Sequence, residues 1–138
     1  MSVSTVALLL VGGGLLLYGV ILFNRFVKLN ALADEAWSGI DVQLKRRHDL
    51  VPALVETVKG YAKHEQETLE EVTSLRNTLR DEKNILQREG GEKTLSRDIG
   101  KLFALAEAYP DLKADQNFRK LQSDLTSVED DLQYARRY

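Results

Sequence analysis

The sequence predicts an all-α protein in which an N-terminal transmembrane helix precedes an antiparallel bundle of three to four helices. Three observations carry this prediction. No charged side chain occurs before Arg25, and cysteine is absent, so no disulfide framework can replace an apolar core. After Ala33, apolar residues return every three or four positions, which is the spacing of an amphipathic helix. The 138 residues therefore provide one membrane segment and one modest domain.

Residues 1–24 form the predicted membrane anchor. A helix from Val3 to Phe23 rises about 31 Å at ~1.5 Å per residue, which matches a hydrocarbon core about 30 Å thick. Within lipid the backbone amides can bond only to each other, so this segment must be helical. Small residues let a neighbouring membrane helix approach closely, and we expect a helix contact at three consecutive glycines, namely Gly12, Gly13 and Gly14.

The charges that follow the apolar run indicate its orientation. A cleaved signal peptide is the alternative, because Ala31-Leu32-Ala33 has the small-x-small pattern of a cleavage site. A secretory signal carries positive charge before its apolar run, however, whereas Arg25 and Lys28 come after it. By the positive-inside rule these two residues place the N-terminus outside and residues 25–138 in the cytoplasm.

The domain that follows is rich in charge but balanced. All 19 basic and 21 acidic residues lie in it, so it has no overall field that would gather phosphates or acidic substrates. Nucleic acid is therefore not an expected partner. The absence of cysteine also excludes a thiolate nucleophile and any metal site built on sulfur.

A long, kinked helical arm is predicted over residues 30–89. Of the thirteen core heptad positions from Trp37 to Leu79, ten are apolar. The a positions are Trp37, Leu44, Val51, Val58, Glu65, Val72 and Leu79, and the d positions are Ile40, Arg47, Leu54, Tyr61, Thr68 and Leu75. Position e adds Val55, Ala62 and Leu69. A stripe of this width is typical of a helix that packs in a globular bundle rather than of a two-stranded coiled coil.

Two breaks are expected in the arm. Pro52 removes one backbone hydrogen bond and crowds the carbonyl of His48, so it predicts a kink. The alternative is a fresh helix that Asp49 caps and that takes Pro52 in its first turn. Because the unbroken arm would be too long for a compact bundle, we also expect a reversal between His64 and Thr78.

Two further helices follow. Gly90-Gly91 predicts a stop, a short amphipathic helix spans residues 94–109, and Pro110-Asp111 ends it. After a loop to about Asp115, the last helix spans residues 115–138. The apolar residues of the short helix are Leu95, Ile99, Leu102, Ala106 and Tyr109, and those of the last are Phe118, Leu121, Leu125, Val128, Leu132 and Ala135. The pattern still runs at the final residue, so either the chain is cut short or another element holds the last turn.

Two long segments resemble the LemA family of small bacterial membrane proteins. Residues 35–65 read EAWSGIDVQLKRRHDLVPALVETVKGYAKHE, and residues 102–138 read LFALAEAYPDLKADQNFRKLQSDLTSVEDDLQYARRY. The resemblance implies a bacterial inner-membrane protein with its N-terminus outside and a cytoplasmic antiparallel bundle, usually described as four-helical. It implies no established catalytic activity and no agreed binding residues, although some relatives are associated with organising specialised membranes. Members usually continue into a longer last helix and a hydrophobic tail, which this sequence lacks.

The titratable residues do not predict a catalytic site. His48 and His64 would lie roughly 24 Å apart on one helix at ~1.5 Å per residue, too far to share a metal. No Glu stands three residues before either histidine, as a di-iron bundle would need, and no phosphate-binding glycine loop or GxSxG occurs. We therefore expect no catalytic, metal-binding or cofactor-binding residues and no small-molecule substrate.

The compact basic run Lys45, Arg46 and Arg47 has two interpretations. It contacts anionic lipid or an acidic partner, or it is a solvated face in which Arg47 is paired internally. Candidate partners for Arg47 on the last helix are Glu129, Asp130 and Asp131. Trp37 is expected to anchor packing rather than to bind a ligand.

The expected function is that of a non-enzymatic, membrane-anchored helical scaffold that forms homo-oligomers or recruits other membrane proteins. Anchoring in a membrane raises the effective concentration of weak contacts, so modest surfaces suffice for assembly. The alternative is a regulatory adaptor that docks on a membrane enzyme or protease.

Overall fold

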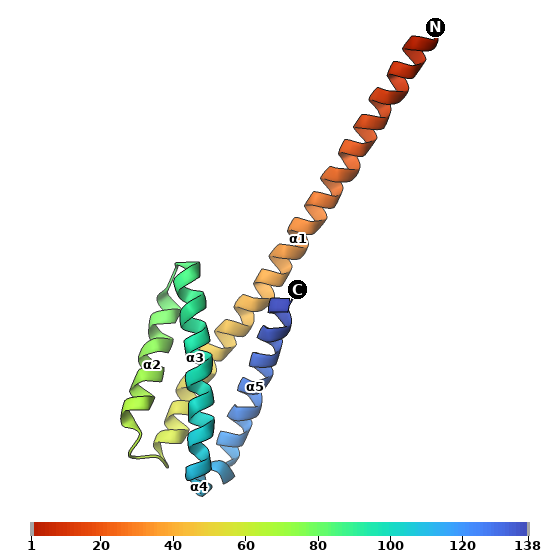
Figure 1. Ribbon diagram of the computed structural model, residues 1–138. Helices are drawn as coiled ribbons and strands as arrows, with labels where there is room; N and C mark the ends of the chain where they lie inside the picture. Colours follow the sequence, from red (N-terminus) through yellow and green to blue (C-terminus); the bar gives the residue numbers. More distant parts are fainter. Residues whose placement is uncertain (1, 138) are drawn as a thin grey trace. The chain divides into compact units, whose positions relative to one another are not determined.

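A computed structural model describes residues 2–137, and these are helical except in short turns, with no strand among them. Figure 1 shows the chain as a ribbon. Residue 1 of the predicted segment 1–24 and residue 138 of the predicted segment 115–138 lie outside the described residues. The chain divides into two compact units, of which the first ends at Gly39 and the second begins at Ile40. The all-α class predicted from the sequence is confirmed.

The first unit is the N-terminal part of helix α1, Val3–Lys59. Its most apolar stretch carries almost no charge, and no part of that stretch is buried. A water-soluble helix buries its apolar side chains, whereas these are exposed to whatever surrounds the molecule. This end of α1 is long and apolar enough to span a membrane.

The second unit contains the remainder of α1 and three further long helices, each running opposite to the one before (Figure 1). Helix α2 spans Gln66–Asp81, α3 spans Ile85–Leu105 and α5 spans Gln116–Arg137. Between α3 and α5 lie a single 3-10 turn, η1 (Ala106–Ala108), and the short helix α4 (Pro110–Ala114). The antiparallel bundle expected from the sequence is therefore present, with four long helical segments.

The core of this unit follows the predicted stripes. The buried apolar residues of α1 and α2 occupy the a, d and e positions, as in Leu44, Val51, Leu54, Val58 and Val72. From α3 and α5 they meet Leu95, Ile99, Leu102, Phe118, Leu125, Val128 and Leu132. The rings of Phe103 and Phe118 pack edge to face at 6.2 Å. Trp37, predicted as a packing anchor, is instead more than half exposed.

The structure divides the long arm expected over residues 30–89 twice, whereas one reversal was predicted. Helix α1 ends at Lys59, and the chain reverses through residues 60–65, mostly before the interval His64–Thr78 predicted for the turn. The heptad phase concealed this turn because Ala62 remains in the core although it lies outside any helix. The second division is at residues 82–84, where the Asn84 side chain caps α3 by accepting the amides of Leu86 (3.1 Å) and Gln87 (3.4 Å).

The predicted stop at Gly90-Gly91 is also wrong, since both glycines lie inside α3. The short helix expected over residues 94–109 therefore starts earlier, at Ile85, and ends at Leu105. A β-carbon on Gly91 would overlap the side chain of Leu79 on α2, whereas one on Gly90 would meet nothing within 4 Å. Gly91 thus allows α2 and α3 to pack closely instead of ending the helix.

Pro110 begins a helix rather than only ending one. It is the first residue of α4, where its missing amide is tolerated, so the loop expected up to Asp115 is largely helical. Asp115 then caps α5 by accepting the amide of Phe118 at 3.0 Å, and it accepts a hydrogen bond from the Tyr61 hydroxyl at 2.7 Å. The Tyr61 hydrogen bond is the main cause that lowers the pKa of Asp115, and the same bond raises the pKa of Tyr61.

Helix α1 continues through Pro52 to Lys59, so the alternative of a fresh helix capped by Asp49 does not occur. Proline has no amide to offer the carbonyl four residues earlier, which belongs to His48. Arg76 of α2 supplies the missing donor, because its Nε lies 2.9 Å from that carbonyl oxygen. The break in the hydrogen bonding of α1 is thereby turned into a tie between two helices.

This tie predicts an energetic coupling between Pro52 and Arg76. Arg76→Ala should lower the free energy of unfolding of the full chain in detergent by about 1.5–3 kcal/mol, because a carbonyl loses a charged donor. In a Pro52→Ala background the loss should fall below about 1 kcal/mol, since the alanine at this position then donates its own amide to the His48 carbonyl. Denaturant unfolding followed by circular dichroism measures both values.

The control is Arg80→Ala, whose side chain is exposed and whose Nε lies 3.5 Å from Oδ1 of its neighbour Asp81. It should cost less than about 0.5 kcal/mol in either background. An equal cost of Arg76→Ala with and without Pro52 would contradict the tie.

Candidate functional site

A cluster of charged side chains lies inside the second unit. Arg47 and His48 come from α1, Glu92 from α3 and Glu129 from α5. Arg47, His48 and Glu92 are only 1 %, 4 % and 2 % exposed, which is rare for ionisable groups. Such burial is tolerated only where each charge is paired and hydrogen-bonded.

The pairing in this cluster is nearly complete. Arg47 donates through Nη1 to the backbone carbonyl and to Oε2 of Glu92, each at 3.2 Å, and through Nη2 to the carboxylate of Glu129. Nε2 of His48 lies 2.7 Å from the other oxygen of Glu92, Oε1. Both carboxylate oxygens of Glu92 are thus occupied by groups from α1.

A second arginine extends the cluster toward its edge. Nε of Arg88 lies 4.0 Å from Oε1 of Glu92, and its Nη2 donates to Asp41 at 3.1 Å. The polar atoms of Arg47 and Glu92 therefore bond within the protein, and their arrangement holds α1, α3 and α5 together. The charged groups of this cluster thus pair with one another and stabilise the packing of the helices.

The predicted basic run divides into two kinds of residue. Arg47 is buried and paired, so the predicted contact with lipid or a partner is wrong for it and the internal pairing is right. Of its three candidate partners, Glu129 is confirmed, whereas Asp130 and Asp131 are exposed. Lys45 and Arg46 are exposed, and Arg46 Nη2 lies 3.9 Å from Asp124. Only these two remain accessible to a lipid or a partner.

Sequence reasoning missed Glu92, although a signal was present. Glu92 lies three residues before Leu95, on the apolar stripe of Leu95, Ile99 and Leu102, where a carboxylate needs a buried partner. The predicted stop at Gly90-Gly91 removed it from the helix and so hid this position. The two histidines lie in different surroundings, because His48 is buried in the cluster whereas His64 is exposed in the turn after α1.

Other predicted site residues lie on the exposed first unit. A β-carbon built on Gly12, Gly13 or Gly14 would have nothing within 4 Å, so these glycines present an open helix surface. The predicted contact with another membrane helix stays a prediction. Arg25 and Lys28 follow the apolar stretch on α1 and are exposed.

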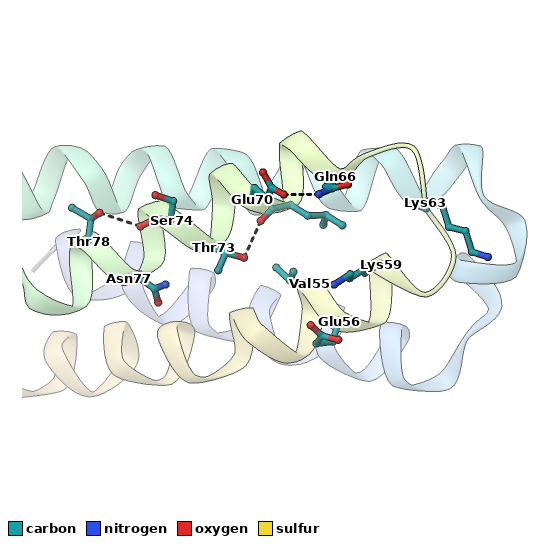
Figure 2. A pocket seen from close by; sticks show the side chains of 12 residues that line it. Val55, Glu56, Lys59, Lys63, Gln66, Glu70, Thr73, Ser74, Asn77 and Thr78 are labelled. Carbon is teal, nitrogen blue, oxygen red and sulfur yellow. Dashed lines mark hydrogen bonds between the residues drawn. The ribbon is translucent and has the colours of Figure 1, made fainter.

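A groove of about 840 Å³ runs between the C-terminal part of α1 and α2 (Figure 2). Apolar side chains lie at its base and charged ones at its edges. Its lining residues are Val55, Glu56, Lys59, Ala62, Lys63, Gln66, Leu69, Glu70, Thr73, Ser74, Asn77 and Thr78. Gln66 donates to Glu70 at 2.7 Å, and Thr73 to the carbonyl of Leu69 at 2.9 Å. The groove offers a mixed apolar and polar contact surface.

No three His, Asp or Glu side chains within residues 2–137 lie close enough together to hold a metal ion.

The different surroundings of two neighbouring arginines predict different costs of substitution. Arg47→Met leaves Glu92 buried without its cationic partner and should lower the free energy of unfolding by about 3–5 kcal/mol. Arg46→Met removes the same charge from an exposed position and should cost less than about 1 kcal/mol. Thermal unfolding of the full chain in detergent, followed by circular dichroism, compares them. Equal losses would contradict the buried cluster.

The family comparison covers the part of the chain that holds the cluster and the groove. No curated protein matches the sequence. The model of the LemA family matches residues 36–138, which is well over half of the 138 residues. The resemblance seen in the two sequence segments is thus confirmed, and the chain belongs to the LemA family.

Proposed function

We propose that this protein is a non-enzymatic, membrane-anchored helical scaffold that self-assembles or recruits partners at the cytoplasmic face of a bacterial membrane. The observation that carries the proposal is the wholly exposed apolar stretch at the start of α1, on the same chain as a separately packed helical unit. Lipid is the surrounding in which that exposed surface is stable.

The proposed membrane is the inner membrane, crossed once, with the N-terminus outside. Arg25 and Lys28 directly follow the apolar stretch, and positive residues stay on the cytoplasmic side. The unit that begins at Ile40 is then cytoplasmic. The described residues of this unit, 40–137, carry charges of both signs at the surface, as a domain in water does.

Contact rather than chemistry is supported by how the ionisable groups are used. Arg47, His48 and Glu92 are as buried as the residues of a catalytic centre, yet their charged groups pair with each other, Arg47 and His48 each with Glu92. Confinement to a membrane raises the effective concentration of each copy, so weak surfaces suffice for assembly. The open glycine surface of Gly12 to Gly14 is one such surface, and homo-oligomers are the expected product.

The groove between α1 and α2 favours a second candidate function, that of a regulatory adaptor. Its apolar base and its charged edges suit a segment of a membrane enzyme or protease. The exposed Lys45 and Arg46 would add contacts to an acidic partner. In this case the protein would adjust its partner without chemistry of its own.

One isolation experiment separates the two candidates. Two tagged forms of the full chain are expressed together, their membranes are solubilised gently, and one form is isolated and its bound proteins are quantified by mass spectrometry. A scaffold predicts that the second tagged form is recovered together with the first, in the proportion that random mixing of the two forms in one oligomer gives. An adaptor predicts one stoichiometric membrane enzyme or protease and no second copy. Recovery of neither contradicts both.

A matched pair of variants tests the groove in the same experiment. Thr78 and Thr126 are exposed, and each donates to the carbonyl four residues earlier, at 3.0 and 2.7 Å, but only Thr78 lines the groove. If an enzyme is recovered, Thr78→Arg should lower its amount at least ~5-fold and Thr126→Arg should not. Equal effects would exclude the groove as the binding surface.

A further inference from the structure

We propose that residues Phe23 to Trp37 of α1, which start at the end of the predicted membrane span, pair with the same residues of a second copy as a parallel, two-stranded coiled coil. This inference rests on the proposed scaffold function and names the surface and the partner through which copies associate. The partner is a second copy of this chain.

This segment of α1 exposes an apolar face. Counting the heptad of α1 back from Trp37 places one face at the a and d positions Phe23, Phe26, Asn30, Ala33 and Trp37. Its three aromatic side chains, Phe23, Phe26 and Trp37, are 67 %, 68 % and 55 % exposed. Beyond Arg25 this face lies past the apolar stretch, where exposed aromatic rings are stabilised by a protein partner.

The charged residues of the segment lie away from the a and d positions. Arg25 lies at c and Lys28 and Glu35 at f, on the outside, and Asp34 lies at e, beside the interface. The g positions are Leu29 and Ala36, so no like charges would face each other across a parallel pair.

One polar residue, Asn30, lies on this face. Asn30 occupies an a position, where one buried asparagine sets the register and favours two strands. Two copies anchored by the same apolar stretch enter the membrane in the same direction and at the same height. Their identical segments therefore meet in parallel and in register, which places Asn30 beside its counterpart.

The face also continues into the apolar stretch. The preceding core heptad positions are Gly12, Leu16 and Gly19, and a β-carbon on either glycine would meet nothing within 4 Å. Small residues one heptad apart allow two membrane helices to approach at the crossing angle of a left-handed coiled coil.

Residues 40–137 expose no apolar stripe that could pair with the face of Phe23, Phe26 and Trp37. The large apolar side chains exposed within residues 40–137 are Val42, Tyr61, Ile85, Leu86 and Tyr134, and these form no stripe at helical spacing. The stripes of α2, α3 and α5 already pack in the core. A second copy, in contrast, brings an identical stripe.

Disulfide formation in native membranes tests the pairing, because the chain has no cysteine of its own. Ala33 lies at d and Ala31 at b, so single variants Ala33→Cys and Ala31→Cys make the same small change on and off the face. Under mild oxidation the full chain with Ala33→Cys should form disulfide dimers at least ~10-fold faster, because bridged Cα atoms must lie within about 7 Å. Equal rates would overturn the inference.

Two outcomes separate this inference from the function on which it rests. If copies are isolated together but Ala33→Cys is no faster than Ala31→Cys, assembly stands and this surface is wrong. If copies are not isolated together either, both fail. Photobleaching of a dye on Lys83→Cys in membranes should give at most two steps, and three or more would overturn the two-stranded arrangement.

Discussion

The buried carboxylate of Glu92 is the interaction on which the arrangement of the bundle depends. One of its oxygens accepts from Arg47 and the other lies beside His48, so α3 can sit against α1 in only one register without leaving a charge unpaired. Glu129 brings α5 to the same arginine. Apolar packing supplies most of the stability of such a unit, but it tolerates slippage that a buried ion pair does not.

Helix α2 joins the same turn of α1 by a different route. Pro52 leaves the carbonyl of His48 without its amide partner, and Arg76 of α2 donates to it. Gly91 then lets α3 approach Leu79 of α2. Helices α2, α3 and α5 therefore all contact the turn of α1 that holds Arg47 and His48. Each of these contacts pairs a polar group that burial or the proline would otherwise leave without a partner.

The sequence could predict whatever depends on local periodicity. The apolar stripes and the heptad phase follow from spacing, and the cost of burying a charge indicated an acidic partner for Arg47 on the last helix, with Glu129 as one of three candidates. The turn at residues 60–65 could not be placed, because Ala62 keeps the phase of the stripe through it. Gly90-Gly91 misled for a similar reason, since the role of Gly91 depends on a leucine from another helix. Glu92 is a partner through space, which spacing along the chain does not reveal.

We propose a single membrane crossing with the helical unit on the cytoplasmic side, and labelling from outside the membrane tests this most directly. Spheroplasts that express Ser2→Cys or Lys83→Cys, both at exposed positions, can be treated with a membrane-impermeant maleimide, with the cysteine-free parent as background. We expect Ser2→Cys to react in intact spheroplasts and Lys83→Cys only after lysis. Labelling of Lys83→Cys in intact spheroplasts, or recovery of the chain in the soluble fraction, would contradict it.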